Sequence, residues 1–177
     1  MRRRIMPERL VLLDADVVIE AFRQGIWDAL IARTHVHVAR AIIEEANFYP
    51  DPLTGQDRRI DLQSYIDQGK ITVLDPDEEA LAQVSNTCRR CLELHDGERS
   101  SLATLVRLGS EYRFCTGDKA AIQALVLLEL SGQSISLDRL LGDAGIARPG
   151  PLGNQFTEQY LERWLRQGSV LRVEIGR

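Results

Sequence analysis

The chain has 177 residues, of which 44% are hydrophobic and 27% charged, and its formal net charge is −4 at pH 7. This length and apolar content suit one domain with additions and a buried core better than two domains. The longest apolar stretch, residues 120–130, contains Gln123 and Glu129 and is too short to span a bilayer, so we expect no membrane partner. Pro7, Glu8 and Arg9 interrupt the apolar segment that a signal peptide would need, and the odd count of three cysteines favours reduced thiols and a cytoplasmic location.

In chain order, residues 10–13 predict a strand that is buried on both faces, because Leu-Val-Leu-Leu leaves no polar face for water. This strand ends on two carboxylates, Asp14 and Asp16. A helix that carries Glu44 and Glu45 follows a second strand. The elements expected in this half are helical pieces at 17–22 and 26–32, a strand at 36–38, a helix at 40–48, a segment without regular structure at 49–57 within a loop or insertion at about 49–61, and a helix at 61–69.

The alternation continues beyond residue 70, with strand signals at residues 71–74 and 112–115. A Thr116-Gly117-Asp118 turn follows the latter strand. Further expected elements are helices at 75–92, from near Glu98 onward and at 119–130, and a candidate fifth strand at 134–137. This pattern predicts an α/β domain with a mainly parallel sheet covered on both faces, a three-layer α/β/α arrangement.

The tail departs from this alternation. Residues 146–153 are rich in Pro and Gly and predict a linker, so we divide the chain into a domain at 1–146 and an extension at 147–177. Phe156, Tyr160 and Trp164 form an aromatic helical stripe that is typical of core packing and also compatible with a homodimer. Residues 170–175 predict an extra strand, so the expected extension is a helix followed by a strand.

Several carboxylates fall at strand ends or on the helices that leave them. Each one alone has an ordinary explanation as a helix cap or a solvated residue. Together they are expected to converge, because the carboxyl ends of parallel strands meet at one edge of a sheet. Converging carboxylates need a counter-charge, and Mg²⁺ or Mn²⁺ prefers such oxygen ligands. A net charge of −4 disfavours a nucleic-acid partner, but bound cations would reverse the local field and weaken this objection.

The order of four motifs resembles the PIN-domain nucleases over roughly residues 10–146. These motifs are Leu-Leu-Asp14-Ala-Asp16-Val-Val-Ile, Ala-Ile-Ile-Glu-Glu45-Ala, Asp-Gly-Glu98-Arg-Ser-Ser-Leu-Ala and Phe-Cys-Thr116-Gly-Asp118-Lys-Ala-Ala. The resemblance implies that Asp14, Glu45, Glu98 and Asp118 are catalytic and hold the metal ions, with Asp16 and Thr116 in supporting positions. Glu44 competes with Glu45 for its position, and Asp96 competes with Glu98.

The resemblance implies that the protein hydrolyses RNA, with two metal ions directing the in-line attack of water. Many members of the family are VapC-like toxins, which would add an antitoxin-like protein as a partner. The insertion at 49–61 and the tail after Ile146 make this chain longer than a minimal toxin is expected to be.

Two other functions remain open at this stage. Asp14-Ala-Asp16-Val-Val also resembles the first motif of haloacid-dehalogenase-type phosphatases, with Asp14 as the nucleophile, but that interpretation leaves Glu45 and Glu98 without a role. A catalytically silent PIN-like module that binds RNA or protein is the other alternative. Cys88, Cys91 and His95 share a helical spacing, but zinc would need a fourth ligand, for which Cys115 is the nearest offered, so ordinary half-buried thiols are favoured.

Overall fold

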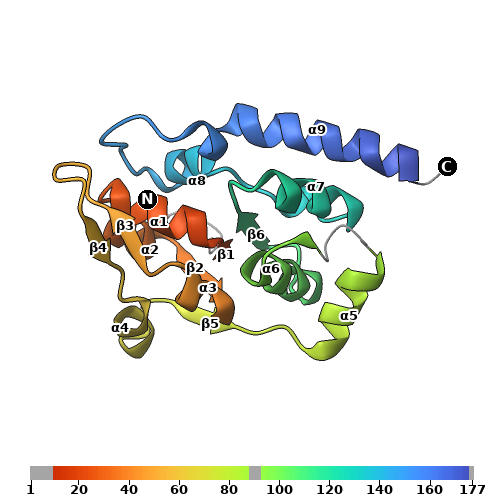
Figure 1. Ribbon diagram of the computed structural model, residues 1–177, viewed down its shortest axis with the longest axis horizontal. Helices are drawn as coiled ribbons and strands as arrows, with labels where there is room; N and C mark the ends of the chain where they lie inside the picture. The colour runs from red at the N-terminus through yellow and green to blue at the C-terminus, as the bar shows by residue number, and fades with distance from the viewer. Residues whose placement is uncertain (1–9, 88–92, 176–177) are drawn as a thin grey trace, which may run out of the picture.

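The central sheet is built from parallel strands in the order β5-β2-β1-β6 (Figure 1). The chain was analysed as a computed structural model that describes residues 10–87 and 93–175. The α/β class and the parallel sheet are therefore confirmed. The strands of this sheet are β1 (Leu10–Leu13), β2 (His35–Ala39), β5 (Thr72–Leu74) and β6 (Tyr112–Cys115).

Helices connect these strands and continue after them. The expected helical segments within 17–33 and 61–69 are confirmed, and the caps agree: Asp61 accepts a hydrogen bond from Ser64 N at 3.2 Å, and Gly69 follows with φ of 68°. The helices are α1 (Ala15–Arg23), α2 (Trp27–Arg33), α3 (Arg40–Glu45), α4 (Leu62–Asp67), α5 (Glu78–Thr87), α6 (Asp96–Arg107), α7 (Lys119–Leu127), α8 (Leu137–Ala144) and α9 (Glu158–Ile175), with short 3₁₀ helices η2 (Ser131–Gln133) and η3 (Asn154–Phe156).

Alternate residues of β1 pack into two separate hydrophobic clusters, as a strand buried on both faces requires. Leu12 packs with Leu102 of α6 and Leu125 of α7, while Val11 and Leu13 belong to the cluster that contains residues of α1, α2 and α8. Figure 1 views the sheet along its strands, with α1 and α2 on one side and α6 and α7 on the other. Helices therefore cover both faces of the sheet. No helix in residues 10–87 and 93–175 is long and apolar enough to cross a membrane.

The expectation of no regular structure at 49–57 is wrong. Strands β3 (Phe48–Pro50) and β4 (Asp57–Arg59) form an antiparallel hairpin in which Phe48 pairs with Arg59. A proline is tolerated because this two-stranded ribbon leaves an edge that needs no donor, and Gly55 turns the chain with φ of 68°. The predicted helix at 40–48 accordingly ends at Glu45.

Two further predicted strands are also wrong. At 134–137, Ser134 forms one isolated bridge with Phe114, and Ser136 instead caps α8 by accepting a hydrogen bond from Arg139 N at 3.0 Å. Residues 170–175 continue α9, so the part of the extension that the structure describes, up to residue 175, contains helix and no strand. Residues 146–153 form neither helix nor strand, as predicted, and the last residues of the helix expected at 75–92 lie outside the described residues.

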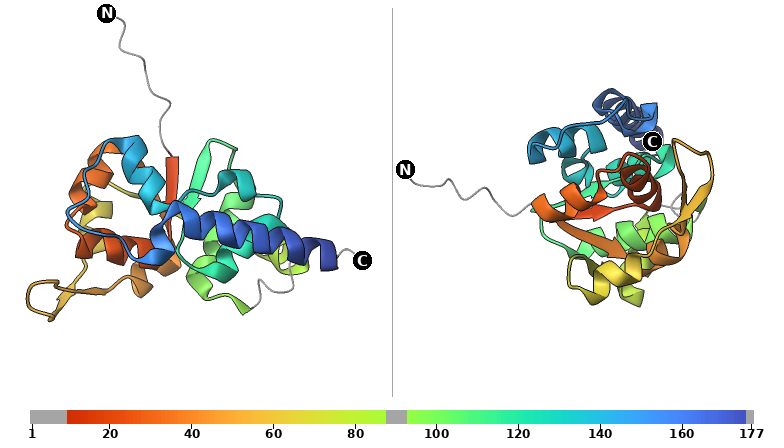
Figure 2. Two further views of the ribbon diagram at one scale, coloured as in Figure 1. Left: turned by 90° about the horizontal axis from the view of Figure 1, so that it is seen from above. Right: turned by 90° about the vertical axis from the view of Figure 1, so that its left-hand side faces the viewer.

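The C-terminal helix α9 lies alongside α7 in both directions of view (Figures 1 and 2). Phe156 and Leu161 of the predicted stripe are buried in this packing, while Tyr160 and Trp164 are half-buried. The stripe therefore serves core packing within the chain, as expected for most such stripes.

Candidate metal centre

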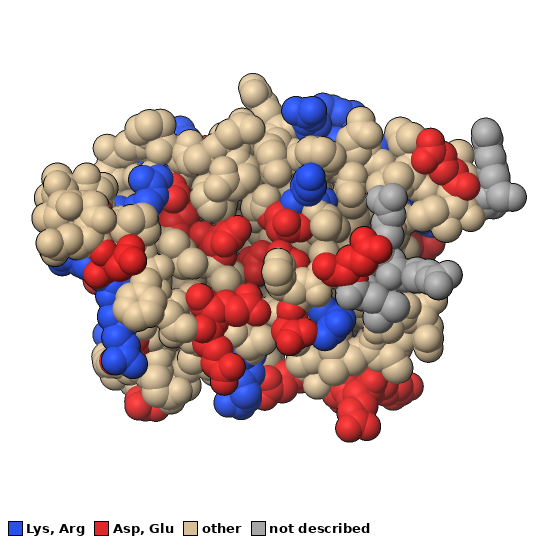
Figure 3. All heavy atoms as spheres, in the orientation of Figure 1, with Lys and Arg blue, Asp and Glu red and all other residues tan. Residues whose placement is uncertain are grey.

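The strand order creates one natural site for a ligand. From β1 the chain moves outward to β2 and β5 on one side of the sheet, and it then returns to place β6 on the other side of β1. Connections leaving β1 and β6 therefore diverge, and ligands of open parallel sheets bind at such a switch point. Asp14 follows β1, and Thr116 and Asp118 follow β6. Figure 3 looks on to these carboxyl ends, and acidic side chains gather in the middle of that face.

Asp14 is the most deeply buried carboxylate of this group, with 3% of its surface exposed. It is the N-cap of α1, and its Oδ1 accepts a hydrogen bond from Ala15 N at 2.8 Å. Its Oδ2 accepts a hydrogen bond from the Thr116 hydroxyl at 2.6 Å. Burial, with smaller contributions from the charges of Asp16 and Glu45, raises the pKa of Asp14 to about 6.

Thr116 links the ends of β1 and β6. While its hydroxyl donates to Asp14, the same oxygen accepts a hydrogen bond from Asp118 N at 3.1 Å. Asp118 caps α7, and its Oδ1 accepts hydrogen bonds from Ala120 N at 2.7 Å and Ala121 N at 2.8 Å. One carboxylate oxygen of Asp118 is thus held by the helix, and the other has no hydrogen-bond donor within the described residues.

Glu98 and Glu45 come from neighbouring helices that pack together, α6 and α3. Glu98 is 8% exposed, and its Oε2 accepts a hydrogen bond from His95 N at 3.1 Å. Glu45 Oε1 accepts a hydrogen bond from Gly97 N at 2.9 Å. Burial, followed by the charges of Asp118 and Asp14 and that of Glu45, raises the pKa of Glu98 to about 8. The four carboxylates that the resemblance assigns are therefore close enough to repel one another.

The structure separates the competing pairs by their surroundings. Glu44 and Glu45 are both exposed, but the Glu45 carboxylate accepts a hydrogen bond from Gly97 N, whereas at Glu44 it is the backbone carbonyl that accepts one, from Asn47. Asp96 points to solvent with its side chain 77% exposed, and it pairs with Arg99 at 2.5 Å. Within each pair, Glu45 and Glu98 are the members that interact with the rest of the cluster. Besides burial, Glu45 helps to raise the pKa of Asp14, and Asp118, Asp14 and Glu45 help to raise that of Glu98.

Asp16 lies in the first turn of α1 at the exposed rim of the cluster. Partial loss of water around the carboxylate and the charge of Asp118 raise the pKa of Asp16, while His95 lowers it. Asp16 and Asp118 thus approach each other from the ends of two different strands. We refer below to Asp14, Asp16, Glu45, Glu98 and Asp118 as the acidic cluster.

The chemistry of the acidic cluster fits a hard divalent cation. Its donors are carboxylate oxygens, and no Lys or Arg of the described residues forms an ion pair with any member. Among those same residues, no three His, Cys, Asp or Glu side chains lie close enough together to share one ion as they stand. The carboxylates are thus gathered around this end of the sheet without converging on a point.

Sequence reasoning did not anticipate two close approaches of backbone. A Cβ atom at Gly97 would lie 2.6 Å from Glu45 Oε2 and 2.6 Å from Ile42 Cδ1, so only glycine lets α3 and α6 approach this closely. A Cβ atom at Gly117 would lie 2.9 Å from Gln155 Cγ, which places the C-terminal extension against the turn that carries Asp118. The glycines beside Glu98 and Asp118 were the sequence signals for these approaches.

The cysteine hypothesis lies mostly outside the described residues, since these exclude Cys88 and Cys91. Cys115 is fully buried as a free thiol, and burial raises its pKa above the usual range. Comparison with known proteins returned no matching family model and no matching curated protein for this chain.

Proposed function

We propose that this chain is a divalent-metal-dependent nuclease of the PIN type that hydrolyses RNA phosphodiester bonds. The observation that carries the proposal is a cluster of carboxylates at the switch point of a parallel sheet, two of which are buried and have a pKa raised by burial and by the charges of their neighbours. A site of this kind gains most from binding a cation, because the cation removes the repulsion. The order of the four sequence motifs supplies the family.

In this proposal Asp14, Glu45, Glu98 and Asp118 hold Mg²⁺ or Mn²⁺. Such ions, when bound, supply an activated water and stabilise the charge that develops on the scissile phosphate. The part of the protein is to fix the ligands beforehand. Each of the four carboxylates is anchored through at least one oxygen by a backbone amide. For three of them, a second oxygen has no hydrogen-bond donor within the described residues and is available to a cation.

Thr116 is a positioning residue in this proposal. Its hydroxyl fixes the orientation of Asp14 and receives the amide of Asp118, so one side chain sets the spacing of two ligands from different strands. Asp16 stands at the rim, where it adds negative charge without being buried.

The phosphatase alternative is less well supported. That mechanism would use Asp14 and leave Glu45 and Glu98 without a role, although Glu45 contributes to the raised pKa of Asp14 and Asp14 contributes to that of Glu98. A silent PIN-like module that binds RNA or protein would have the same acidic cluster. A measurement of RNA cleavage therefore decides between the nuclease and the silent module. A toxin-like role with an antitoxin-like partner, a homodimer and a cytoplasmic location remain proposals that follow from the family resemblance and the sequence.

The direct test is cleavage of a mixed, end-labelled RNA pool in Mg²⁺, in Mn²⁺ and in EDTA by the wild type and Asp14→Asn. We expect metal-dependent fragments that the variant does not produce. Asp67→Asn is the matched control, because Asp67 is an exposed residue of α4 whose carboxylate accepts a hydrogen bond from Gln63. Metal binding without fragments would favour the silent module. Turnover of p-nitrophenyl phosphate with trapping of beryllofluoride at Asp14 would establish the phosphatase.

A further inference from the structure

Helix α9 is fixed to α7, the helix that begins directly after Asp118. A Cβ atom at Gly168 would lie 2.9 Å from Val126 Cγ2, so the two helices are in close contact there. Glu158, at the start of α9, accepts a hydrogen bond from the Ser136 hydroxyl at 2.5 Å, and Arg172 near its end pairs with Glu129. The side chains of α9 that face α7 therefore have a defined position beside the acidic cluster.

Two cations meet on one aromatic ring at this junction. Lys119 Nζ lies 5.9 Å from the centroid of the Trp164 ring, and Arg163 Cζ lies 5.3 Å from it. Tyr160 packs edge-on against the same ring with the centroids 6.0 Å apart. The face of an aromatic ring attracts cations, so Trp164 holds both side chains against its ring. We call Lys119, Arg163 and Trp164 the cationic ledge.

The charges of the cationic ledge are not neutralised by the protein. Neither Lys119 nor Arg163 forms an ion pair within the described residues, whereas Arg166 on the same helix pairs with Glu162 at 3.7 Å. Both cations of the ledge are exposed to solvent. In Figure 3, basic side chains over α7 and α9 border the acidic region in the middle of the face. Unpaired positive charge thus stands directly beside the unpaired negative charge of the acidic cluster.

We propose that the cationic ledge binds phosphate groups of an RNA strand next to the carboxylates, so that the C-terminal helix supplies part of the substrate site. This inference rests on the proposed nuclease function. The acidic cluster by itself repels a polyanion, and a strand that crosses it needs cations at the border. Because Lys119 follows Asp118 in the chain, a phosphate held by the ledge adjoins the one that the metal ions would hold.

The test measures binding of a labelled, unstructured oligoribonucleotide by fluorescence anisotropy in EDTA, where metal-dependent cleavage does not occur. Arg163→Gln and Lys119→Gln should each weaken binding by about two- to fivefold, the size expected for an exposed ion pair. Each should also lower the slope of log affinity against log salt by about 0.7. Arg166→Gln is the matched control on the same helix and should leave both quantities unchanged. If the cationic ledge contacts phosphates, Arg163→Gln and Lys119→Gln should lose the same affinity for an oligonucleotide with abasic positions.

Equal losses of affinity in Arg163→Gln and Arg166→Gln would overturn the proposal, because both losses would then reflect net charge alone. A wild type that does not bind RNA at low salt would also overturn it. The two proposals fail separately. Binding that depends on the ledge in a protein that never cleaves RNA would sustain the ledge and refute the nuclease. Cleavage with binding that is indifferent to Lys119 and Arg163 would do the reverse. Thermal midpoints of the Lys119, Arg163 and Arg166 variants equal to that of the wild type would confirm that the fold is intact.

Discussion

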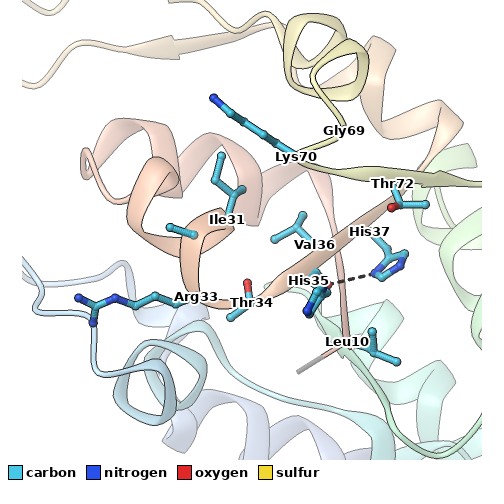
Figure 4. A pocket seen from close by; sticks show the side chains of 11 residues that line it. Leu10, Ile31, Arg33, Thr34, His35, Val36, His37, Gly69, Lys70 and Thr72 are labelled. Atoms are coloured by element: carbon cyan, nitrogen blue, oxygen red, sulfur yellow. Dashed lines mark hydrogen bonds between the residues drawn. The ribbon is translucent and has the colours of Figure 1, made fainter. Parts of the chain in front are cut away.

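The two ends of the central sheet both carry charged side chains, but these charges meet different surroundings. At the amino ends of β1, β2 and β5 a cavity of about 430 Å³ is lined by Arg33, His37 and Lys70, among others (Figure 4). Arg33 donates to the carbonyls of Ala144 and Gly145, His37 Nδ1 lies 3.0 Å from His35 O, and Lys70 stands over the Tyr65 ring at 5.6 Å. At the carboxyl ends, the acidic cluster has no cationic partner among the described residues.

The size of a cavity therefore indicates less about its chemistry than the contacts that its charged groups make. Arg33 and Lys70 at the amino ends contact carbonyls and the Tyr65 ring of their own chain, and these contacts stabilise the fold. Burial lowers the pKa of His37, which favours its neutral form. The carboxylates at the other end repel one another when ionised, and burial together with their neighbours raises the pKa of Asp14 and Glu98. The following experiments test this difference between the two ends.

The largest expected effect is that of Asp14→Asn. Loss of supporting residues around a metal site typically costs about 10–100-fold, so removal of a ligand should lower RNA cleavage by at least about 100-fold. The fold should remain intact or gain stability, because one charge leaves a repulsive group. Metal titration and thermal unfolding check both points. A variant that unfolds while its metal affinity is unchanged would contradict the assignment.

Gly97→Ala should disturb the acidic cluster without removing any charge. The new methyl group would lie 2.6 Å from Glu45 Oε2, so Glu45 must move away from the amide that anchors it. We expect Mg²⁺ affinity to fall about tenfold and stability to fall by about 1–3 kcal/mol, as is usual for overpacking. Gly142→Ala is the control, because a Cβ atom there has no neighbour within 4 Å. Equal metal affinities in the two variants would refute the role of Glu45.

The stability of the metal-free protein should depend on pH in a characteristic direction. The pKa of Asp14 is raised from 3.8 to about 6 and that of Glu98 from 4.5 to about 8, so the folded state keeps protons that the unfolded chain has lost. Stability in EDTA should therefore fall as the pH rises from about 4 to about 8, with Asp14 accounting for on the order of 3 kcal/mol. Below this interval both states are protonated and the difference vanishes.

Thermal unfolding in EDTA at several pH values measures this dependence. Asp14→Asn should flatten the profile relative to the wild type, and Mg²⁺ should restore stability at pH 8 because it replaces the lost protons. A wild-type profile with the same slope as that of Asp14→Asn would show that Asp14 titrates normally.

The smallest effect is expected at the opposite end of the sheet. Arg33→Ala removes the donor to the carbonyls of Ala144 and Gly145 and should cost under about 1 kcal/mol, because the pair is exposed. RNA cleavage and metal affinity should not change. A marked loss of cleavage with unchanged stability would mean that the amino ends of the strands take part in substrate binding, and the contrast between the two ends would disappear.

Local sequence patterns predicted the parallel strands well. A continuous apolar run marks β1, and β-branched or aromatic residues mark β2, β5 and β6, although these three strands also contain polar residues such as His37, Thr72 and Arg113. These patterns failed where packing overrides propensity. Val170, Val173 and Ile175 favour a strand by their β-branched side chains, yet they continue a helix that is held to α7 through Gly168. Ser136 belongs to a β-like sequence but acts as a helix cap.

The gathering of Asp14, Glu98 and Asp118 at one edge could be predicted from strand order and motif resemblance. The sequence could not separate Glu45 from Glu44, since adjacent residues on a helix differ only in direction, and direction is set by the packing of α3 on α6. Nor could it place the extension beside the Thr116-Gly117-Asp118 turn, because no local pattern encodes a contact between Gly117 and Gln155.

The contact of Gln155 and Phe156 with Gly117 also bears on the order of events during protein synthesis. The ribosome makes α9 and the residues that precede it after every residue of the acidic cluster has left the peptidyl-transferase centre, and earlier segments can fold meanwhile. A nascent chain therefore contains all of these carboxylates before Gln155 and Phe156 can contact the turn that carries Asp118 and before Trp164 can contact its two cations. On the proposals made above, such a chain would have the metal ligands but an incomplete RNA-binding surface, which would delay activity until translation of α9 is finished.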